Sequence, residues 1–325
     1  MNYMRIIFKK FKARMIVGCI LAVIALLAVS VIVFINQASF GRTPRGERLE
    51  RVMKSPNYRN GEFKNQHETL LMTSDRGRFS GIWEFIFRKI DGLRPKQAVK
   101  AIKTDLRKID RNEEILVWFG HSSYLIQTGG KRILVDPVFC MASPVSFVNK
   151  PFKGTELYTP DDMPDIDYLV ISHDHWDHLD YNTVKKLKDR IGAVICPLGV
   201  GEHFEYWGFD KERLIELDWN EDANLAPGFM IHCLPARHFS GRGLTANQSL
   251  WASFLLETPS QKIYIGGDGG YDTHYAEIGN RFPDIDLVIL ENGQYNEEWS
   301  LIHLMPQYMA QTARDLKAKR VLTVH

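Results

Sequence analysis

From residue 114 onward, the chain alternates short apolar runs with polar turns, and this pattern predicts most of its secondary structure. Short apolar runs bounded by turn residues are typical of buried strands. The predicted strands cover 115–119, 122–128, 131–136, 167–172 and 193–197, and then 214–219, 228–236, 249–257, 262–267, 286–291 and 320–324. Helical patterns cover 181–191, the region near 273–279, and 306–318. Strands followed by helices, twice over, predict two mixed layers packed face to face with helices outside.

The N-terminal region has a different pattern, because residues 15–35 form one apolar run, MIVGCILAVIALLAVSVIVFI, without a charge. Such a run is long enough to cross the roughly 30 Å hydrocarbon layer as a helix. A cleaved signal peptide usually has a shorter apolar stretch of about 7 to 15 residues, so a retained single-pass anchor is favoured. Basic residues flank the run on both sides but lie closer to it within residues 1–14. We therefore expect the N-terminus in the cytoplasm and the rest of the chain on the extracytoplasmic side.

Residues 36–112 lack a steady periodicity and are rich in Gly, Pro, Asn and Arg at their start, which predicts a lead-in segment with short helices and no separate core. Within it, SGIWEFIFRKI at 80–90 gathers aromatic and basic residues. This stretch is interpreted as a short helix packed on the domain, and contact with a bilayer interface is the alternative. The remaining residues, 113–325, form the predicted main folded domain.

Composition narrows the class of protein only slightly. The 325 residues are 45% hydrophobic and 25% charged, as in ordinary globular proteins, and the formal net charge is +2. No long basic stripe supports a nucleic-acid partner, so none is expected. The four cysteines, Cys19, Cys140, Cys196 and Cys233, stand far apart and are predicted to be free and mostly buried.

The densest chemical signal is ISHDHWDHLD at 171–180, which directly follows the apolar run YLVI. If the strand geometry persists, His173 and His175 point the same way, and Asp177 and His178 can turn back as the chain enters the next helix. Imidazole nitrogens and carboxylate oxygens are ligand types of zinc, and a site completed by distant residues with an open position is typical of catalysis. The pattern therefore predicts a catalytic metal site rather than a solvated polar loop.

An HxHxDH string followed by a distant His, an Asp and a final His resembles the metallo-β-lactamase-fold hydrolases. The segments WFGHSSYLIQTGGKRILVDPVF, ISHDHWDHLDYNTV, PLG, IELDW, SLWASF, GGDGGY and EIGNRF resemble more closely the N-acyl-phosphatidylethanolamine phospholipase D branch and its bacterial relatives, which include lactonases. The resemblance runs from about Trp118 to His325, with a weaker likeness over 46–65. It implies an α/β fold, a four-layer αββα sandwich, placed after the membrane helix.

Carried over by position, the resemblance implies two zinc ions (Zn2+) per chain. It assigns His173, His175 and His238 to one ion, Asp177, His178 and His325 to the other, and Asp268 as the bridge between them. Two metals that share a water can lower its pKa towards about 7 and stabilise the oxyanion that forms.

Three further positions match the family with less definite roles. Asp136 would orient a ligand or handle a proton, although a buried Asp that caps the turn before Pro137 is the alternative. His303 would contact the substrate or protonate the leaving group. His121 would orient a metal ligand or have a purely structural role. The other histidines, His67, His203, His232 and His274, are predicted to be surface or core residues.

Two departures from the family pattern affect the interpretation. DGGY at 268–271 removes a hydroxyl found beside the bridging Asp, and Glu291 and Asn292 stand where the phospholipase has small and apolar residues. The substrate contacts therefore need not match. Because His325 is the last residue here, we expect a fragment or a shortened chain with a weakened second metal site.

The sequence therefore predicts a membrane-anchored dinuclear zinc hydrolase, a phosphodiesterase of phospholipase D type that uses metal-bound hydroxide on N-acyl-phosphatidylethanolamine-like lipids or a small phosphodiester. A lactonase or other carbonyl-ester hydrolase on the same metals is one alternative, since fold alone does not settle the reaction. A non-catalytic metal-binding domain is the other, and it predicts no metal-dependent turnover. Iron or manganese could also be held by such ligands.

Overall fold

The computed structural model describes residues 2–73, 92, 94–145 and 148–325, which form two compact units, Met1–Phe40 and Gly41–His325. The predicted aromatic-basic helix at 80–90 lies outside the described residues.

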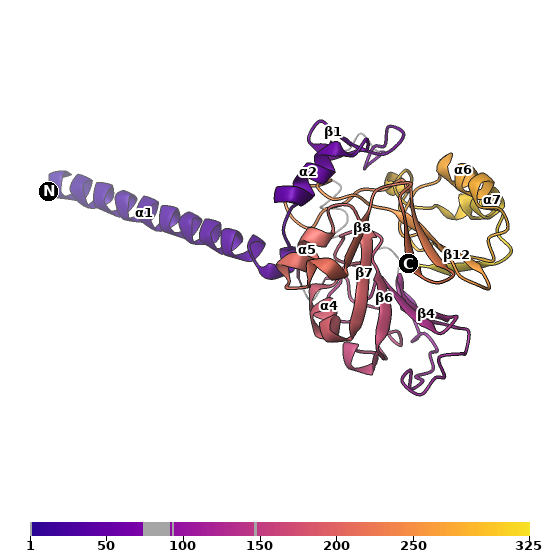
Figure 1. The fold of residues 1–325 in the computed structure, drawn as a ribbon. Coiled ribbons are helices and arrows are strands. Elements are labelled where there is room, and N and C mark those ends of the chain that lie inside the picture. Colours follow the sequence, from indigo (N-terminus) through magenta and orange to yellow (C-terminus); the bar gives the residue numbers. More distant parts are fainter. Residues whose placement is uncertain (1, 74–91, 93, 146–147) are drawn as a thin grey trace. The chain divides into compact units, whose positions relative to one another are not determined.

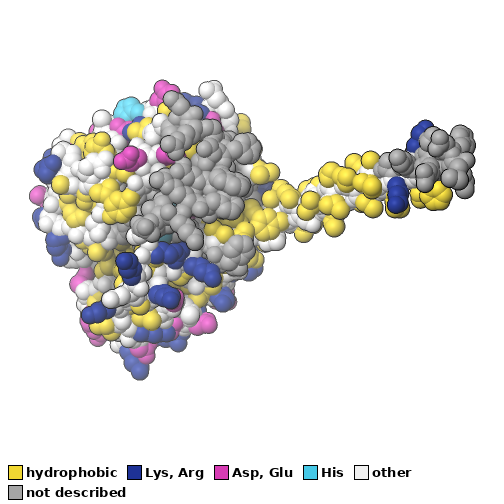
Figure 2. Space-filling model, turned by 180° about the vertical axis from the view of Figure 1, so that it is seen from behind, with side chains coloured by type: hydrophobic (Ala, Val, Ile, Leu, Met, Phe, Trp, Pro, Cys, Tyr) yellow, Lys and Arg dark blue, Asp and Glu magenta, His cyan; other side chains and the backbone are white. Residues whose placement is uncertain are grey.

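The first unit is the helix α1 (Asn2–Ile35), followed by the short helix η1 (Ala38–Phe40). An 18-residue window within Lys10–Ile35 has a mean hydropathy of 3.2, and this stretch is long and apolar enough to cross a membrane. In Figure 2 the hydrophobic side chains of this helix form an almost continuous surface, with Lys and Arg side chains near its N-terminal end. An isolated helix that exposes apolar residues all round is unusual in water, and this exposure is consistent with the expected transmembrane helix.

The second unit contains two six-stranded sheets (Figure 1). The first sheet runs in the order β3-β4-β5-β6-β7-β8. Its strands are β3 (Ile115–Gly120), β4 (Ser123–Thr128), β5 (Lys131–Val135), β6 (Ile166–Val170), β7 (Ile191–Pro197) and β8 (Leu214–Leu217). The first three strands pair antiparallel, and β5 to β8 pair parallel.

The second sheet repeats this plan in the order β14-β13-β12-β11-β10-β9. Its strands are β9 (Asp222–Ala226), β10 (Phe229–Leu234), β11 (Ser253–Glu257), β12 (Lys262–Ile265), β13 (Leu287–Glu291) and β14 (Val321–Val324). The strands from β9 to β12 pair antiparallel, and β12 to β14 pair parallel. Both halves of the unit therefore consist of an antiparallel meander that continues into parallel strands.

Side chains that alternate along the strands build three apolar layers. In β4, Tyr124 and Ile126 face the core between the sheets, whereas Leu125 faces an outer core. That outer core contains residues of α4 (Tyr181–Leu187) and α5 (Gly201–Tyr206), and a third core joins the second sheet to α6 (His274–Arg281). The layers are therefore helix, sheet, sheet, helix, which confirms the predicted αββα sandwich.

Residues 41–73 pack on this sandwich through α2 (Gly46–Lys54) and the small hairpin of β1 (Tyr58–Arg59) and β2 (Glu62–Phe63). Val52 and Phe63 are fully buried in the core between the sheets. Arg48 of α2 forms ion pairs with Glu202 and Glu216, both at 2.6 Å. The start of the predicted lead-in segment thus contributes to the central core.

The remaining elements are short. They are η2 (Pro160–Asp162), η3 (Lys188–Arg190), η4 (Lys211–Arg213), η5 (Glu297–Trp299), η6 (Pro306–Tyr308) and α7 (Met309–Asp315).

Most predicted strands are present, and the differences have local reasons. The helix predicted over 181–191 ends at Leu187, because Ile191 pairs with Ile166 and begins β7. The strand β9 and the helix α5 were not predicted, since neither DANLA nor GEHFEY carries a clear apolar period. All four cysteines are free, but only Cys196 and Cys233 are buried, so the prediction of mostly buried cysteines is wrong for Cys19 and Cys140.

Candidate metal centre

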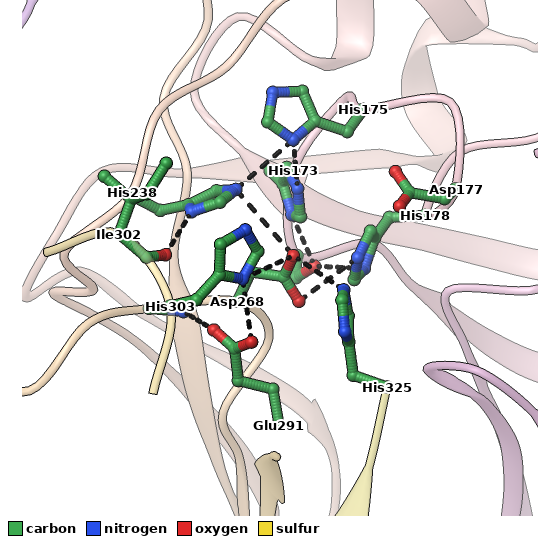
Figure 3. Close-up of polar contacts among 12 residues, drawn as sticks. His173, His175, Asp177, His178, His238, Asp268, Glu291, Ile302, His303 and His325 are labelled. Carbon is green, nitrogen blue, oxygen red and sulfur yellow. Dashed lines mark hydrogen bonds and ion pairs between the residues drawn. The ribbon is translucent and has the colours of Figure 1, made fainter. Parts of the chain in front are cut away.

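Polar side chains gather where five strands end. They are Asp136 after β5, His173 after β6, Asp268 after β12, Glu291 at the end of β13 and His325 after β14. Parallel strands carry their carboxyl ends to one edge of a sheet, and that edge is where open α/β sheets bind ligands. Figure 3 shows the side chains from both sheets converging there.

The first ligand group consists of His173, His175 and His238, whose potential ligand atoms all lie within 4.8 Å of one another. His173 Nε2 and His238 Nε2 face His175 Nδ1 at 2.9 Å and 3.2 Å. The Nδ1–H of His238 donates to the carbonyl oxygen of Ile302 at 2.7 Å, which leaves Nε2 with its lone pair. Burial lowers the pKa of His173 and of His238 well below the ordinary value, so both rings are neutral, as metal ligands must be.

The second ligand group consists of Asp177, His178 and His325, and the structure adds His121 to it within the same 4.8 Å limit. The carboxylate of Asp177 is 3.5 Å from His121 Nε2. Because the backbone N–H of His325 also donates to the carbonyl oxygen of His121 at 2.9 Å, the loop after β3 holds the end of β14. Sequence reasoning gave His121 only a supporting role, and its adjacency to a ligand was visible only in the fold.

Asp268 lies between the two groups and is buried. Its Oδ1 is 3.2 Å from His178 Nε2, and its Oδ2 is 3.2 Å from His325 Nε2 and 3.8 Å from His238 Nε2. Burial would raise the pKa of Asp268, but His178 and His325 outweigh it and hold this pKa well below the ordinary value. Asp268 is therefore an ionised carboxylate placed where a bridging ligand would be expected.

The close spacing of buried nitrogen and oxygen atoms at the centre is explained better by bound metal ions than by hydrogen bonds. Among the described residues, His178 Nε2, His325 Nε2 and Asp268 Oδ1 are buried without a hydrogen-bond partner, even though they lie at ion-pair distances. Ligand nitrogens about 2.0–2.1 Å from a tetrahedral zinc are about 3.3 Å apart, close to the spacing within the first ligand group. Buried polar atoms that face one another without bonding point to a shared cation. The donor set therefore fits two divalent ions, although the ligand roles stay a prediction.

Asp136 supports this arrangement without facing the centre. Its Oδ2 accepts hydrogen bonds from His178 Nδ1 at 2.9 Å and from the Ser172 hydroxyl at 2.6 Å, and its Oδ1 accepts from the Ser172 N–H at 2.8 Å. Because His178 uses Nδ1 here, its Nε2 is left for the centre (Figure 3). Burial opposes protonation of His178, but Asp268 and Asp136 outweigh it and raise the pKa well above the ordinary value. A metal cation bound to Nε2 of a neutral His178 would balance the negative charge of Asp268 and Asp136 in place of the proton.

A second supporting network surrounds Asp174, which lies between the two histidines His173 and His175. Its carboxylate accepts from the N–H of Gly241 at 2.7 Å and from the hydroxyl of Ser249 at 2.8 Å. It also contacts His203 Nε2 at 3.1 Å. His203 in turn accepts from the backbone N–H of Arg42 at 3.0 Å through Nδ1. His203 is buried, as expected, but its link to the motif had no signal in the sequence.

His303 lies beside the centre, with its Nδ1 2.8 Å from Glu291 Oε2 and 3.8 Å from Asp268 Oδ2. Burial opposes protonation of His303, but Glu291 and Asp268 outweigh it and raise the pKa. Sequence reasoning placed His303 at the site but treated Glu291 only as a departure from the family pattern. The other three histidines lie elsewhere: His67 pairs with Asp272, His232 contacts Glu257, and His274 is buried in α6.

Comparisons with known proteins agree with this geometry. The family model described as the β-lactamase superfamily domain matches residues 131–325, which include every metal ligand predicted from the sequence but not His121. A search of solved structures finds CmlA, a diiron β-hydroxylase from Streptomyces venezuelae, with a TM-score of 0.51 and 20% identity over 65% of this chain and 44% of that one. At this identity the likeness shows the fold alone.

Among curated proteins, an uncharacterised protein of Mycobacterium tuberculosis is 38% identical over 78% of this chain and 68% of its own length. The N-acyl-phosphatidylethanolamine-hydrolysing phospholipase D 1 of Caenorhabditis elegans is 29% identical over 64% of this chain and 62% of its own length. The mitochondrial phospholipase D of the same specificity from Saccharomyces cerevisiae is 33% identical over 64% of this chain and 46% of its own length. The match therefore spans about half to two thirds of these relatives.

Proposed function

The chain belongs to the β-lactamase superfamily, and from this premise we propose that it is a membrane-anchored dinuclear zinc hydrolase that cleaves phosphodiesters. The proposed substrate class is a phospholipid of the N-acyl-phosphatidylethanolamine type. The observation that carries the proposal is the convergence of the two ligand groups on the buried carboxylate of Asp268.

The residues of the chain divide the work at such a site. The first ligand group and the second ligand group would each hold one ion, with Asp268 between them. When bound, two such ions supply a water of lowered pKa and positive charge for the oxygen that becomes negative during the reaction. Asp136 keeps His178 in one tautomer, and Ile302 does the same for His238 through its carbonyl oxygen. His303, which keeps some exposure, would contact the substrate.

Two observations support a lipid as the substrate. The phospholipase relatives from worm and yeast are named for the hydrolysis of N-acyl-phosphatidylethanolamine. The helix α1 has the length and apolar composition of a membrane span, which would hold the catalytic unit near a bilayer. A relative from Klebsiella pneumoniae, 59% identical over 29% of this chain, is named an outer membrane protein.

The test is metal content and hydrolysis by the full-length chain purified in detergent. We expect about two zinc ions per chain and cleavage of bis-p-nitrophenyl phosphate and of N-acyl-phosphatidylethanolamine in mixed micelles, both abolished by a chelator and restored by zinc. Cleavage of an aryl lactone alone would replace the phosphodiesterase with a carbonyl-ester hydrolase. Bound metal without turnover of any ester would replace the enzyme with a metal-binding domain.

For the membrane topology, we propose a cytoplasmic N-terminus and an extracytoplasmic catalytic unit. The support is the group of Lys and Arg residues within residues 1–14, because positive charges next to a span favour the cytoplasmic side. A C-terminal fusion to an alkaline phosphatase, which is active only outside the cytoplasm, should be active in intact cells. An inactive phosphatase, with a fluorescent cytoplasmic reporter at the same position, would reverse the orientation.

A further inference from the structure

Glu291 is a buried carboxylate at the end of β13, and both of its oxygens have partners. Oε1 accepts a hydrogen bond from the backbone N–H of Gly269 at 2.7 Å, and Oε2 lies 2.8 Å from His303 Nδ1. Its side chain is 1% exposed. Burying a carboxylate costs free energy unless the group is paired and hydrogen-bonded. A buried carboxylate with both oxygens bonded beside the candidate metal centre is therefore a candidate for a functional role.

The geometry fixes where the ring of His303 carries its hydrogen. An ionised carboxylate only accepts hydrogen bonds, so the nitrogen that faces Glu291 must donate. Nδ1 therefore carries a hydrogen in both the neutral and the protonated ring, and only Nε2 can gain or release one. Figure 3 shows the second ring nitrogen of His303 turned away from Glu291.

The same carboxylate also fixes the position of the ring relative to the proposed bridging residue. Gly269, whose N–H is held by Glu291, directly follows Asp268 in the chain. His303 Nδ1 is 3.8 Å from Asp268 Oδ2. Glu291 thus joins the segment that carries Asp268 to the ring of His303 through two hydrogen bonds. A rigid connection of this kind is needed to hold a side chain within a fraction of an ångström of a reacting group.

We propose that Glu291 is a positioning residue that fixes His303 with its hydrogen on Nδ1 and thereby presents Nε2 to the substrate. The inference rests on the proposed function, since it deepens the account of that same site. Nε2 can then form a hydrogen bond with the substrate or with a water that the substrate contacts. The acidic residue that departs from the phospholipase pattern is therefore part of the working site.

The competing explanation is that Glu291 is itself a metal ligand. One oxygen of Glu291 lies within 4.8 Å of potential ligand atoms of Asp268, His303 and His325. Both oxygens are already engaged by N–H donors, however, and a metal would have to displace one of them. The two explanations differ in what the loss of the carboxylate does to metal content.

The decisive variant is Glu291→Gln, which keeps the size of the side chain. The Gly269 N–H requires an acceptor, so the amide oxygen of Gln would face Gly269 and the amide NH2 group would face His303. Nδ1 would then have to accept, and the hydrogen would move to Nε2. We expect kcat on bis-p-nitrophenyl phosphate to fall about 10- to 100-fold, as is typical when an outer hydrogen-bond partner is lost, with KM unchanged within about 2-fold.

Three readouts separate a positioning role from a structural one. The zinc content of Glu291→Gln should stay equal to that of the unaltered full-length chain, whereas a loss of one ion per chain would make Glu291 a ligand and overturn the inference. In a chain that already carries His303→Gln, adding Glu291→Gln should lower kcat only slightly further. The effects of two substitutions are not additive when one residue acts through the other. Additive losses would show that Glu291 acts independently of His303. Glu297→Gln, the same change at an exposed position of the following loop, is the matched control and should leave kcat unaltered.

A measurement without turnover decides the tautomer directly. In the ¹⁵N spectrum of the histidine-labelled, zinc-loaded chain, His303 should show a protonated Nδ1 and, in Glu291→Gln, a protonated Nε2. A protonated Nε2 and a bare Nδ1 in the unaltered chain would overturn the inference even if Glu291→Gln failed to fold. If the unaltered chain hydrolyses no ester, the proposed function fails while this spectrum still decides the role of Glu291.

Discussion

The two ligand groups differ in how firmly the fold holds them. In the first ligand group, His173 and His238 are almost completely buried, and the Nδ1 atom of each ring has its own partner in Ser172 and Ile302. In the second ligand group, only His178 is held in this way, through Asp136. The side chain of Asp177 is 25% exposed, and its ion-pair partner is His121 at 3.5 Å. Two of the three histidines of the first group are therefore held before any ion binds, against one of the three predicted ligands of the second group.

This difference teaches that the two proposed ions should not bind equally well. A ligand set that is largely oriented beforehand loses little conformational entropy when the ion arrives, whereas a partly exposed carboxylate must be ordered at that moment. The HxHxDH motif contributes to both groups, so its sequence gives no hint of the asymmetry. The expected order of metal release is the second ligand group first.

The largest effect is expected from His173→Ala, which removes a buried histidine of the first ligand group. The substitution deletes one proposed ligand and leaves His175 and His238 facing an empty buried space. We expect loss of at least one zinc per chain and a drop in kcat/KM for bis-p-nitrophenyl phosphate larger than the roughly 100-fold upper range for outer partners. Elemental analysis with parallel kinetics measures both, and full retention of two ions would remove His173 from the ligand set.

The next largest effect is expected from Asp177→Ala, which tests whether the second ligand group binds its ion more weakly than the first. Because Asp177 is proposed to belong only to the second ligand group, the variant should keep about one zinc per chain and lose most phosphodiesterase activity. Titration of the unaltered chain with a chelator should show two phases, and the variant should retain only the tighter one. A variant that retains only the weaker phase would reverse the comparison between the groups.

A smaller effect is expected from Asp136→Asn, which changes an outer partner rather than a ligand. Asn keeps only one accepting oxygen and gains an NH2 group, so it cannot accept from His178 Nδ1, Ser172 N–H and Ser172 Oγ together. We expect the affinity for the second zinc to fall about 10- to 100-fold while the first zinc is retained. Competition with a fluorescent zinc indicator measures the affinity, and an unchanged second affinity would leave Asp136 with only its turn-capping role.

The smallest effect is expected from His67→Gln, which controls for the loss of a histidine as such. His67 is exposed and pairs with Asp272 on the surface, and such pairs contribute about 0–1 kcal/mol to the free energy of unfolding. Metal content and kcat/KM should be unchanged, and thermal unfolding should shift by no more than a few degrees. A change in metal content would mean that the centre extends to this surface.

Much of the fold could be predicted because its signals are local. The strands β4, β5, β6, β12 and β13 are short apolar runs ended by turn residues, and each was placed within about two residues. The strand β9 was missed because its sequence, DANLA, lies at the edge of the sheet and buries too little to carry an apolar pattern. The burial of Arg48 and Val52 in α2 could not be predicted from the sequence, because the helix is polar overall. Which of its side chains are buried depends on how the helix packs against the sandwich.

The candidate site divides in the same way. His173, His175, Asp177 and His178 lie within six positions of one another, so the residue types and their spacing alone predict a metal site. His238, Asp268 and His325 were added through a family resemblance, and the structure brings all three to the same edge of the sandwich. The hydrogen bonds of Glu291 with His303 and of Asp174 with His203 join residues that are 12 and 29 positions apart, and no local pattern marks them.

By itself, the sequence determined the apolar N-terminal helix, the alternation of strands and helices, and the cluster of histidine and aspartate side chains behind β6, because each depends on residues that are neighbours in the chain. Only the tertiary structure decided that His121 lies beside the second ligand group, which side chains of the two groups are held by a second hydrogen bond, and which histidine faces Glu291. These properties depend on the pairing of β5 with β6, of β12 with β13 and of β13 with β14, which brings the ends of separate strands together. The packing of the two sheets sets the burial and the hydrogen bonding at that edge. This packing joins residues that are far apart in the chain, so no single stretch of sequence can show it.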